Sequence, residues 1–410
     1  MDRRLFLKSS AALLGTGLFP FGQSGWALAA NPASPTQKKL VVVMLRGAVD
    51  GLNVVAPYAD ANYYALRPGI AVAKPGAADG LLDLDGYFGL HPALTPLQPL
   101  WQAKQLAFVH AAGSPDATRS HFDAQDYMES GTPGRKGTAD GWMNRLLATL
   151  PGEMSPTRAV SIGPTLPRIL SGRIGVANVA SGNAAGKPTV LDRPKVDDAF
   201  SQLYKGDDKL AQAYEEARET HKEVMDSLAD EMMAASNGAP LPNGFPTDAV
   251  QLAKLMRKGN VQLAFIALGG WDTHINQGAG KGQLANRLAP VGEGLAQLAQ
   301  ALGPMWNDTT VVVMSEFGRT AKQNGNGGTD HGHGNVMWLL GGAVAGGKVY
   351  GDWRGLDNAA LYEQRDVPVT TDFRAVLAQV AERHLRLPDA QLAQIFPGLT
   401  TTAPRGLIRA

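Results

Sequence analysis

Carboxylate and imidazole side chains recur in this sequence directly after apolar runs. Asp50 follows the first run, Asp272 and His274 follow the third, and Glu316 follows the fourth. Such groups are ligands for hard and borderline divalent cations. The chain contains no cysteine, so a metal site would be built from histidine, carboxylate, hydroxyl or backbone oxygen. Asp272 and His274 alternate as in an extended segment, which lets both side chains face one way.

A glycine-rich loop at 324–328 leads to a second group of candidate ligands. It delivers Asp330, His331 and His333 within a few residues. Glycine allows a loop to wrap tightly around an ion, although ordering the loop costs entropy. Any one of these residues could equally be a turn former or an ordinary surface residue. The prediction of a metal site therefore depends on how many such residues there are and on where they lie.

Four continuous apolar runs are typical of buried parallel strands. They are Leu40–Leu45, Leu106–Ala111, Val261–Leu268 and Thr310–Met314. Helical patterns follow at His121–Glu129 and Gln283–Leu302, with a further one at Asp372–Leu385. This alternation predicts a doubly wound, mainly parallel α/β sheet with helices on both faces. Because ligands bind beyond the carboxyl ends of such strands, the polar groups are expected to meet at one edge.

Other residues at the strand ends suit catalysis or anion binding. Ser120 precedes the helical pattern that His121 begins, so it fits either an N-cap or a nucleophile placed against the helix dipole. Arg46, Arg119 and Arg319 could hold an anionic group through forked hydrogen bonds, or they could form salt bridges.

The N-terminus has the pattern of an export signal. Arg3 and Arg4 lie in a basic head, followed by the apolar stretch Ala11–Phe21 and the small-residue site Ala27–Ala29. These features predict a cleaved twin-arginine signal at residues 1–29, which the twin-arginine translocase would recognise. The apolar stretch is shorter than the roughly 20 residues of a membrane span, so no stable span is expected. The remainder is therefore predicted to be periplasmic or secreted.

Residues 30–410 are predicted to form one α/β domain. Within it, the segment at about 195–236 is rich in Asp, Glu, Lys and Ala with helical spacing, which indicates a helical insertion. The formal net charge is +1, so the composition gives no basic footprint for nucleic acid.

At these motifs the chain resembles the twin-arginine-exported family known as domain of unknown function fifteen-oh-one. That family is grouped with the alkaline phosphatase and sulfatase superfamily. The matching pieces are spread over most of the chain. They are Leu45–Asn53, Ser120–Asp123, Gly141–Trp142, Gly270–His274, Ser315–Thr320, Asp330–Gly332, Gly347–Gly351 and Thr370–Arg374.

The resemblance implies an alkaline phosphatase-like fold, one or two divalent metals at strand ends, and a hydroxyl nucleophile. The candidate metal ligands are Asp50, Asp272, His274, Glu316, Asp330 and His331, with His333 as the alternative late histidine. The candidate catalytic residues are Ser120 as nucleophile, with His121 and Arg319. The ion is zinc, manganese, calcium or magnesium, and histidine ligands favour zinc or manganese.

The sequence also departs from the superfamily pattern. The usual Asp-x-x-x-His becomes Asp272-x-His274, and the Asp-His pair after the fourth strand becomes Ser315-Glu316. The absence of cysteine excludes a sulfatase that makes formylglycine from cysteine.

Two functions follow as alternatives from different classes. The first is an exported metal-dependent hydrolase acting on phosphate or sulfate esters, with an anionic ester or glycan as substrate. The alternative is a non-catalytic exported binding protein that keeps the fold. An oxidoreductase ranks below both, because no Gly-x-Gly-x-x-Gly follows a strand and no haem motif is present.

Overall fold

The computed structural model describes residues 37–153, 155–181, 232 and 234–409. The export signal predicted at 1–29 lies outside the described residues, as does nearly all of the helical insertion predicted at 195–236. Within the described ranges, none of the helices combines the length and the apolar character needed to span a bilayer.

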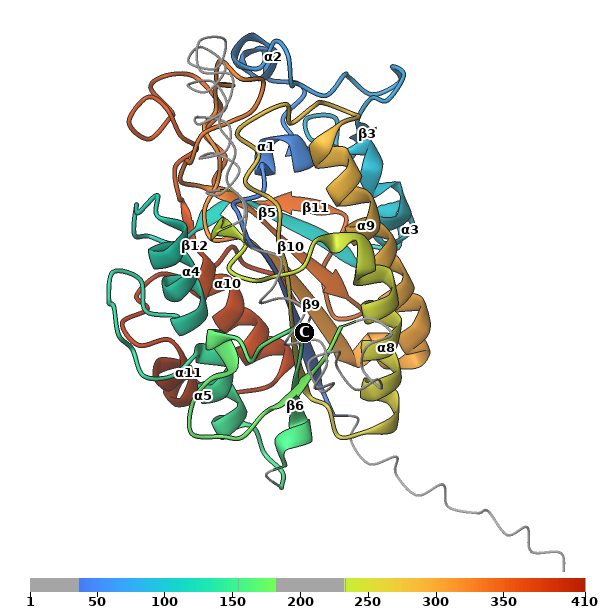
Figure 1. The fold of residues 1–410 in the computed structure, drawn as a ribbon, viewed down its shortest axis with the longest axis vertical. Coiled ribbons are helices and arrows are strands. Elements are labelled where there is room, and N and C mark those ends of the chain that lie inside the picture. The colour runs from blue at the N-terminus through green and yellow to red at the C-terminus, as the bar shows by residue number, and fades with distance from the viewer. Residues whose placement is uncertain (1–36, 154, 182–231, 233, 410) are drawn as a thin grey trace, which may run out of the picture. The chain divides into compact units, whose positions relative to one another are not determined.

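A nine-stranded sheet forms the centre of the described chain (Figure 1), in the order β11-β5-β10-β9-β1-β8-β6-β7 with β12 paired to β5. The strands are β1 (Lys39–Leu45), β5 (Leu106–Gly113), β6 (Ala159–Ile162), β7 (Ala177–Val179), β8 (Leu263–Leu268), β9 (Thr309–Met314), β10 (Asn335–Gly341), β11 (Lys348–Tyr350) and β12 (Thr371–Asp372). A small separate sheet joins β2 (Val55–Ala56), β4 (Gly89–Leu90) and β3 (Leu82–Asp83).

Most neighbours in the large sheet are parallel, which confirms the predicted α/β class. β1 pairs in parallel with both β8 and β9, and β6 pairs in parallel with β8 and β7. β10 is the exception, because it runs antiparallel to both β5 and β9. All seven residues of β10 are buried, as are all residues of the parallel strands β1 and β9. A continuous apolar run therefore indicates that a strand is buried on both faces of the sheet. It does not indicate whether the strand is parallel or antiparallel to its neighbours.

Helices cover both faces of this sheet, with α8 and α9 on one face and α5 and α10 on the other (Figure 1). The bounds of the α-helices in the described chain follow. They are α1 (Gly51–Val54), α2 (Ala61–Leu66), α3 (Gln98–Gln102), α4 (His121–Ser130), α5 (Trp142–Thr149), α8 (Phe245–Lys258), α9 (Gln283–Leu302), α10 (Phe373–Gln379) and α11 (Asp389–Ile395). The pattern predicted at Gln283–Leu302 coincides with α9, and the one at Asp372–Leu385 corresponds to α10 and the π-helical turn Val380–His384 that follows it.

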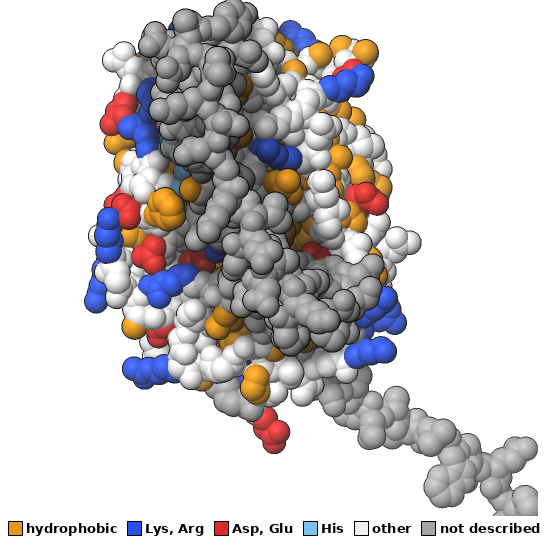
Figure 2. Space-filling model, viewed as in Figure 1, with side chains coloured by type: hydrophobic (Ala, Val, Ile, Leu, Met, Phe, Trp, Pro, Cys, Tyr) orange, Lys and Arg blue, Asp and Glu red, His pale blue; other side chains and the backbone are white. Residues whose placement is uncertain are grey.

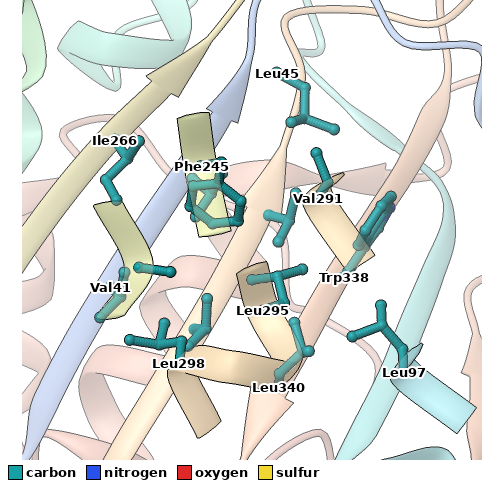
Figure 3. Packing of buried hydrophobic residues seen from close by; sticks show 14 of the residues in the cluster. Val41, Leu45, Leu97, Phe245, Ile266, Val291, Leu295, Leu298, Trp338 and Leu340 are labelled. Carbon is teal, nitrogen blue, oxygen red and sulfur yellow. The ribbon is translucent and has the colours of Figure 1, made fainter. Parts of the chain in front are cut away.

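Alternation along β1 divides the core into two layers. Val41 packs with Leu295 of α9 and Phe245 of α8 on one face (Figure 3). Val42 packs with Leu146 of α5 and the α10 side chains on the other face. Successive side chains of a strand point to opposite faces, so one apolar strand supports both layers of helices.

The parallel strands β1, β8 and β9 bring their carboxyl ends to one edge of the sheet, termed here the strand-end edge. The loops that follow them touch through their backbones, since Arg46 N–H donates to Leu268 O at 2.8 Å. Gly47 has a φ of +113°, and a Cβ there would lie 2.6 Å from the backbone nitrogen of Asp272. Glycine is therefore required at this position for the two loops to approach so closely.

The surface of the described residues carries charges of both signs. On the face shown in Figure 2, lysine and arginine side chains are interspersed with aspartate and glutamate. The charge on that face is accordingly mixed, in line with the formal net charge of +1 for the whole chain.

Candidate metal centre

Three histidine rings and one carboxylate converge at the strand-end edge. The Nε2 atom of His331 lies 3.0 Å from Nε2 of His121 and 3.0 Å from Nε2 of His274. Oδ1 of Asp272 lies 3.0 Å from His274 Nε2 and 3.3 Å from His331 Nε2, and Oδ2 lies 3.5 Å from His121 Nε2. These four residues are called the histidine cluster below. They come from the start of α4, the loop after β8, and the loop before β10.

The second nitrogen of each ring faces an oxygen acceptor. The acceptors are Glu316 Oε1 for His121 (2.9 Å), the backbone oxygen of Arg119 for His331 (2.9 Å) and Asp330 Oδ1 for His274 (3.4 Å). A ring that donates to its acceptor through Nδ1 presents the lone pair of Nε2 to the cluster. Histidines that bind metals are oriented in this way by carboxylate and backbone oxygens.

The donor set of the histidine cluster fits a divalent cation. Lone pairs on neighbouring Nε2 atoms repel unless a proton or a cation lies between them. Asp272 is wholly buried, and its Oδ2 has no hydrogen-bond partner. Ligands bound to one ion at about 2.0–2.1 Å lie about 3 to 3.4 Å from each other. The ligand atoms of His121, Asp272 and His331 all lie within 4.8 Å of one another, and His274 adjoins this group through His331 and Asp272.

The carboxylates around the cluster favour positive charge on it. Burial would raise the pKa of Asp272, but the three adjacent histidine rings and the charge of Arg319 hold it well below its usual range. Burial would lower the pKa of His121, but its bonds to Asp272 and Glu316 outweigh this effect and raise the pKa to about 9. The raised value expresses an excess of negative charge around the ring, which a bound cation would also neutralise.

Arg319 anchors the carboxylate of the cluster. Its Nη1 donates to Oδ1 of Asp272, and both side chains are fully buried. Its Nε donates to Thr329 Oγ1 at 3.1 Å, and its Nη2 donates to the backbone oxygen of Thr329. The guanidinium therefore balances the charge of Asp272 through Oδ1 and ties it to the loop that carries His331.

Glu316 supports the cluster through His121. Its Oε1 accepts from Gly47 N–H at 2.7 Å and from Gln125 Nε2 at 3.0 Å, in addition to the ring of His121. Its Oε2 accepts from Ser315 Oγ at 3.0 Å. Burial raises the pKa of Glu316, but His121 and the other donors bring it below its ordinary value. Both carboxylate oxygens thus have donors, and the side chain orients His121.

The remaining carboxylates predicted as ligands lie in different settings. Asp330 is half-exposed, and its Oδ1 accepts from Asn324 Nδ2 at 3.0 Å beside the His274 ring. Asp50 is fully buried and contacts Arg67 at 2.5 Å and Gln277 at 2.6 Å. The structure brings Asp272, His274 and His331 together, places Glu316 and Asp330 behind two of the rings, and pairs Asp50 with an arginine.

The sequence left His331 and His333 open as the late histidine, and the structure places them differently. His333 Nε2 bonds to the backbone oxygen of Ser114 at 3.1 Å, and its ring packs on Tyr362. His331, not His333, therefore faces the cluster. His121 was expected among the catalytic residues, yet its ring joins the nitrogens of the cluster. The sequence feature that could have predicted His121 as a ligand is its position in one of the polar segments that follow the apolar runs.

Ser120 lies at the rim of the site. It is the N-cap of α4, its Oγ accepts from Asp123 N–H at 3.4 Å, and it is exposed. The residues on either side of it both touch the cluster, because the backbone oxygen of Arg119 accepts from His331 and the next residue is His121. Ser120 thus caps the helix between Arg119 and His121, which both contact the site.

The three arginines proposed to bind anions differ in exposure. Arg46 is buried and pairs with Glu129 at 2.5 Å, and Arg319 is buried against Asp272. Arg119 pairs with Glu363 at 2.7 Å and Asp366 at 2.8 Å, but its side chain remains 33% exposed. Of these three, Arg119 is placed to reach a ligand in solvent.

Comparison with known proteins gives similar folds and a family. Among proteins whose functions have been curated, none matches this chain. Among solved structures, the chain is similar to Ps i-CgsB in complex with k-i-k-neocarrahexaose, with a TM-score of 0.41 and 12% identity over 87% of this chain and 74% of that one. A 2-O GAG sulfatase gives a TM-score of 0.41 and 10% identity over 90% and 76%. A protein in the alkaline phosphatase superfamily from Vibrio parahaemolyticus gives 0.35 and 11% over 77% and 62%.

The family match is made on the sequence itself and covers most of the chain. The family described as protein of unknown function (DUF1501) matches residues 37–396. That range contains all the strands of the central sheet and every residue of the histidine cluster. The chain therefore belongs to the DUF1501 family, as its sequence motifs indicated.

Proposed function

We propose that this protein is a metal-dependent hydrolase of anionic esters, with phosphate or sulfate esters as its substrate class. The observation that carries the proposal is the convergence of three Nε2 lone pairs on the buried carboxylate of Asp272, at separations of 3.0–3.5 Å. His121, Asp272 and His331 would hold the ion, with His274 beside them. A divalent ion there would lower the pKa of a bound water or hydroxyl and would stabilise negative charge on ester oxygens.

The surrounding residues have separate parts in this proposal. Glu316 and Asp330 fix the orientation of two rings, and Arg319 keeps Asp272 in place. The side chains of His274 and His331 are 10% and 15% exposed, so solvent reaches the cluster. Ser120 is the proposed nucleophile because it lies at the N-terminus of α4 beside His121, where the helix dipole favours developing negative charge. Arg119 would contact the anionic group of the substrate.

The test is elemental analysis of the full chain purified without chelators, followed by assays with 4-nitrophenyl phosphate, bis(4-nitrophenyl) phosphate and 4-nitrophenyl sulfate. We expect a stoichiometric divalent ion, zinc or manganese by its histidine ligands, and cleavage of at least one ester. Ser120→Ala should abolish cleavage and retain the ion. Ser155→Ala is the matched control, since Ser155 also caps a helical turn and its hydroxyl, within the described chain, hydrogen-bonds to Thr157.

Each other outcome has a definite meaning. An ion bound without cleavage of any of the three esters would favour the non-catalytic binding protein. If no ion is found, and neither zinc nor manganese raises the melting temperature as binding to the folded state requires, the hydrolase proposal is abandoned.

We also propose that the chain is exported by the twin-arginine translocase and acts in the periplasm or outside the cell. The support is the sequence of residues 1–29 with its adjacent Arg3 and Arg4. Replacing both arginines by lysine should leave the uncleaved precursor in the cytoplasm, as measured by cell fractionation and immunoblotting. Export that continues in a strain without this translocase would contradict the proposal.

A further inference from the structure

A second buried cation site lies at the strand-end edge, beside Asp50 and apart from the histidine cluster. Four oxygens converge there on the guanidinium of Arg67, which is fully buried. They are Asp50 Oδ2 (2.5 Å from Nη1), Asn53 Oδ1 (3.0 Å from Nη1), the backbone oxygen of Thr320 (2.8 Å from Nη2) and that of Ala321 (2.8 Å from Nε). This group of oxygens is called the oxygen cradle.

The cradle is built to hold positive charge. Asp50 and Asn53 are fully buried, and the two backbone carbonyls belong to residues that are also buried. A buried carboxylate and buried carbonyl oxygens that face one another are stabilised by a cation among them. The same kinds of oxygen bind calcium and magnesium in proteins. Arg67 supplies the cation instead, and all three of its nitrogens donate to the cradle.

The chain holds Arg67 in this position from both sides. The backbone oxygen of Leu66 accepts from Gln323 N–H at 3.0 Å, and Gly69 N–H donates to Gln323 Oε1 at 2.7 Å. The segment around Arg67 is thereby fastened to the loop that supplies two of the cradle oxygens.

A chain of hydrogen bonds joins the cradle to the histidine cluster. Gln277 Nε2 donates to Asp50 Oδ2 at 2.6 Å, and Gln277 Oε1 accepts from Thr329 Oγ1 at 3.1 Å. Thr329 is in turn held by Arg319, the partner of Asp272. The two carboxylates therefore have one internal guanidinium each, but only Asp272 also faces imidazole nitrogens.

We propose that Arg67 is an internal cation that permanently fills the oxygen cradle, so that this edge takes one metal ion rather than two. Asp50 then serves as the counter-ion of Arg67 and not as a metal ligand. The single-ion statement rests on the proposed function of the histidine cluster. The assignment of Arg67 does not, because it depends only on the contacts of the cradle.

The internal cation is tested by chemical rescue of melting temperature. Arg67→Ala should lower the melting temperature, and millimolar guanidinium chloride should raise it again by several degrees, while the wild type shows no rise. The matched control is Arg67→Ala with Asp50→Asn, which empties the cradle of cation and carboxylate together. It should melt above Arg67→Ala, because removing one partner alone strands a buried charge, and it should not respond to guanidinium.

The result that overturns the assignment is a folded Arg67→Ala variant that guanidinium does not stabilise. If Arg67→Ala cannot be purified, a double variant that is equally unstable overturns it as well, since the two charges would then not be coupled.

Metal content tests the single ion separately. The wild type and Asp50→Asn should each hold one ion per chain. Two ions in the wild type, or loss of the ion from Asp50→Asn, would overturn the single-ion proposal. An absence of any ion would defeat the proposed function, yet it would leave the guanidinium experiment as a valid test of Arg67.

Discussion

Asp272→Asn is expected to remove the metal ion and to destabilise the fold by about 3–5 kcal/mol, the cost of leaving a buried charge without its partner. The charge left behind is that of Arg319, which is fully buried against Asp272. A neutral amide can neither balance Arg319 nor match a divalent ion, so we expect the metal affinity to fall by more than about 100-fold, beyond the loss typical of outer-shell changes. Elemental analysis and denaturant unfolding measure the two effects.

Asp330→Asn is the matched control for that substitution. Asp330 carries the same functional group, but its side chain is 54% exposed and touches the cluster only through the Nδ1 side of His274. We expect a loss of metal affinity of about 10-fold and little change in stability. If Asp272→Asn still contains a stoichiometric ion, the histidine cluster is not the metal site.

Gly318→Ala is expected to be the most disruptive small substitution near the site. A Cβ at Gly318 would lie 1.9 Å from the backbone oxygen of Gly334. The two segments are also locked by backbone hydrogen bonds, from Gly318 N–H to His333 O and from Gly332 N–H to Gly318 O, both 2.8 Å long. Because backbone cannot yield like a flexible side chain, we expect a loss of about 3 kcal/mol or more, at the upper end of overpacking costs.

The same substitution should weaken metal binding, since the displaced segment carries His331. Gly325→Ala provides the control within the neighbouring glycine-rich loop, because a Cβ at Gly325 meets no atom within 4 Å. Its stability should stay within about 0.5 kcal/mol of the wild type. Thermal unfolding of both variants, with and without added zinc, distinguishes them. Equal melting temperatures would show that the two segments can separate without cost.

The strands that position the site were predictable because they are buried on both faces. The apolar runs found in the sequence correspond to β1, β5, β8 and β9, and all residues of β1, β5 and β9 are buried. β10 was not predicted, although Val336–Leu340 is equally apolar. Its place between β5 and β9 and its reversed direction depend on long-range pairing, which local hydrophobicity does not encode.

The residue types of the site were predictable, but their individual roles were not. Each role depends on the direction in which a ring or carboxylate points. Hydrogen-bond partners that are distant in the sequence set that direction. The backbone oxygen of Arg119 turns His331 toward the cluster, and Glu316 does the same for His121. Asp50 has the same strand-end position as Asp272, but Arg67 comes from a segment outside every motif and neutralises it. Sequence spacing carries no information on such pairings.

The wide separation of the cluster residues along the chain has a consequence for the rates of folding and unfolding. His121 and His331, whose rings meet in the cluster, are 210 residues apart in the sequence. Contacts across such distances require most of the chain to be ordered first, because closing long loops costs entropy. An ion that binds only when all the cluster residues have come together would not be bound in the folding transition state. Its binding energy would then add to the barrier against unfolding and leave the refolding rate unchanged, so the ion would set the lifetime of the native chain.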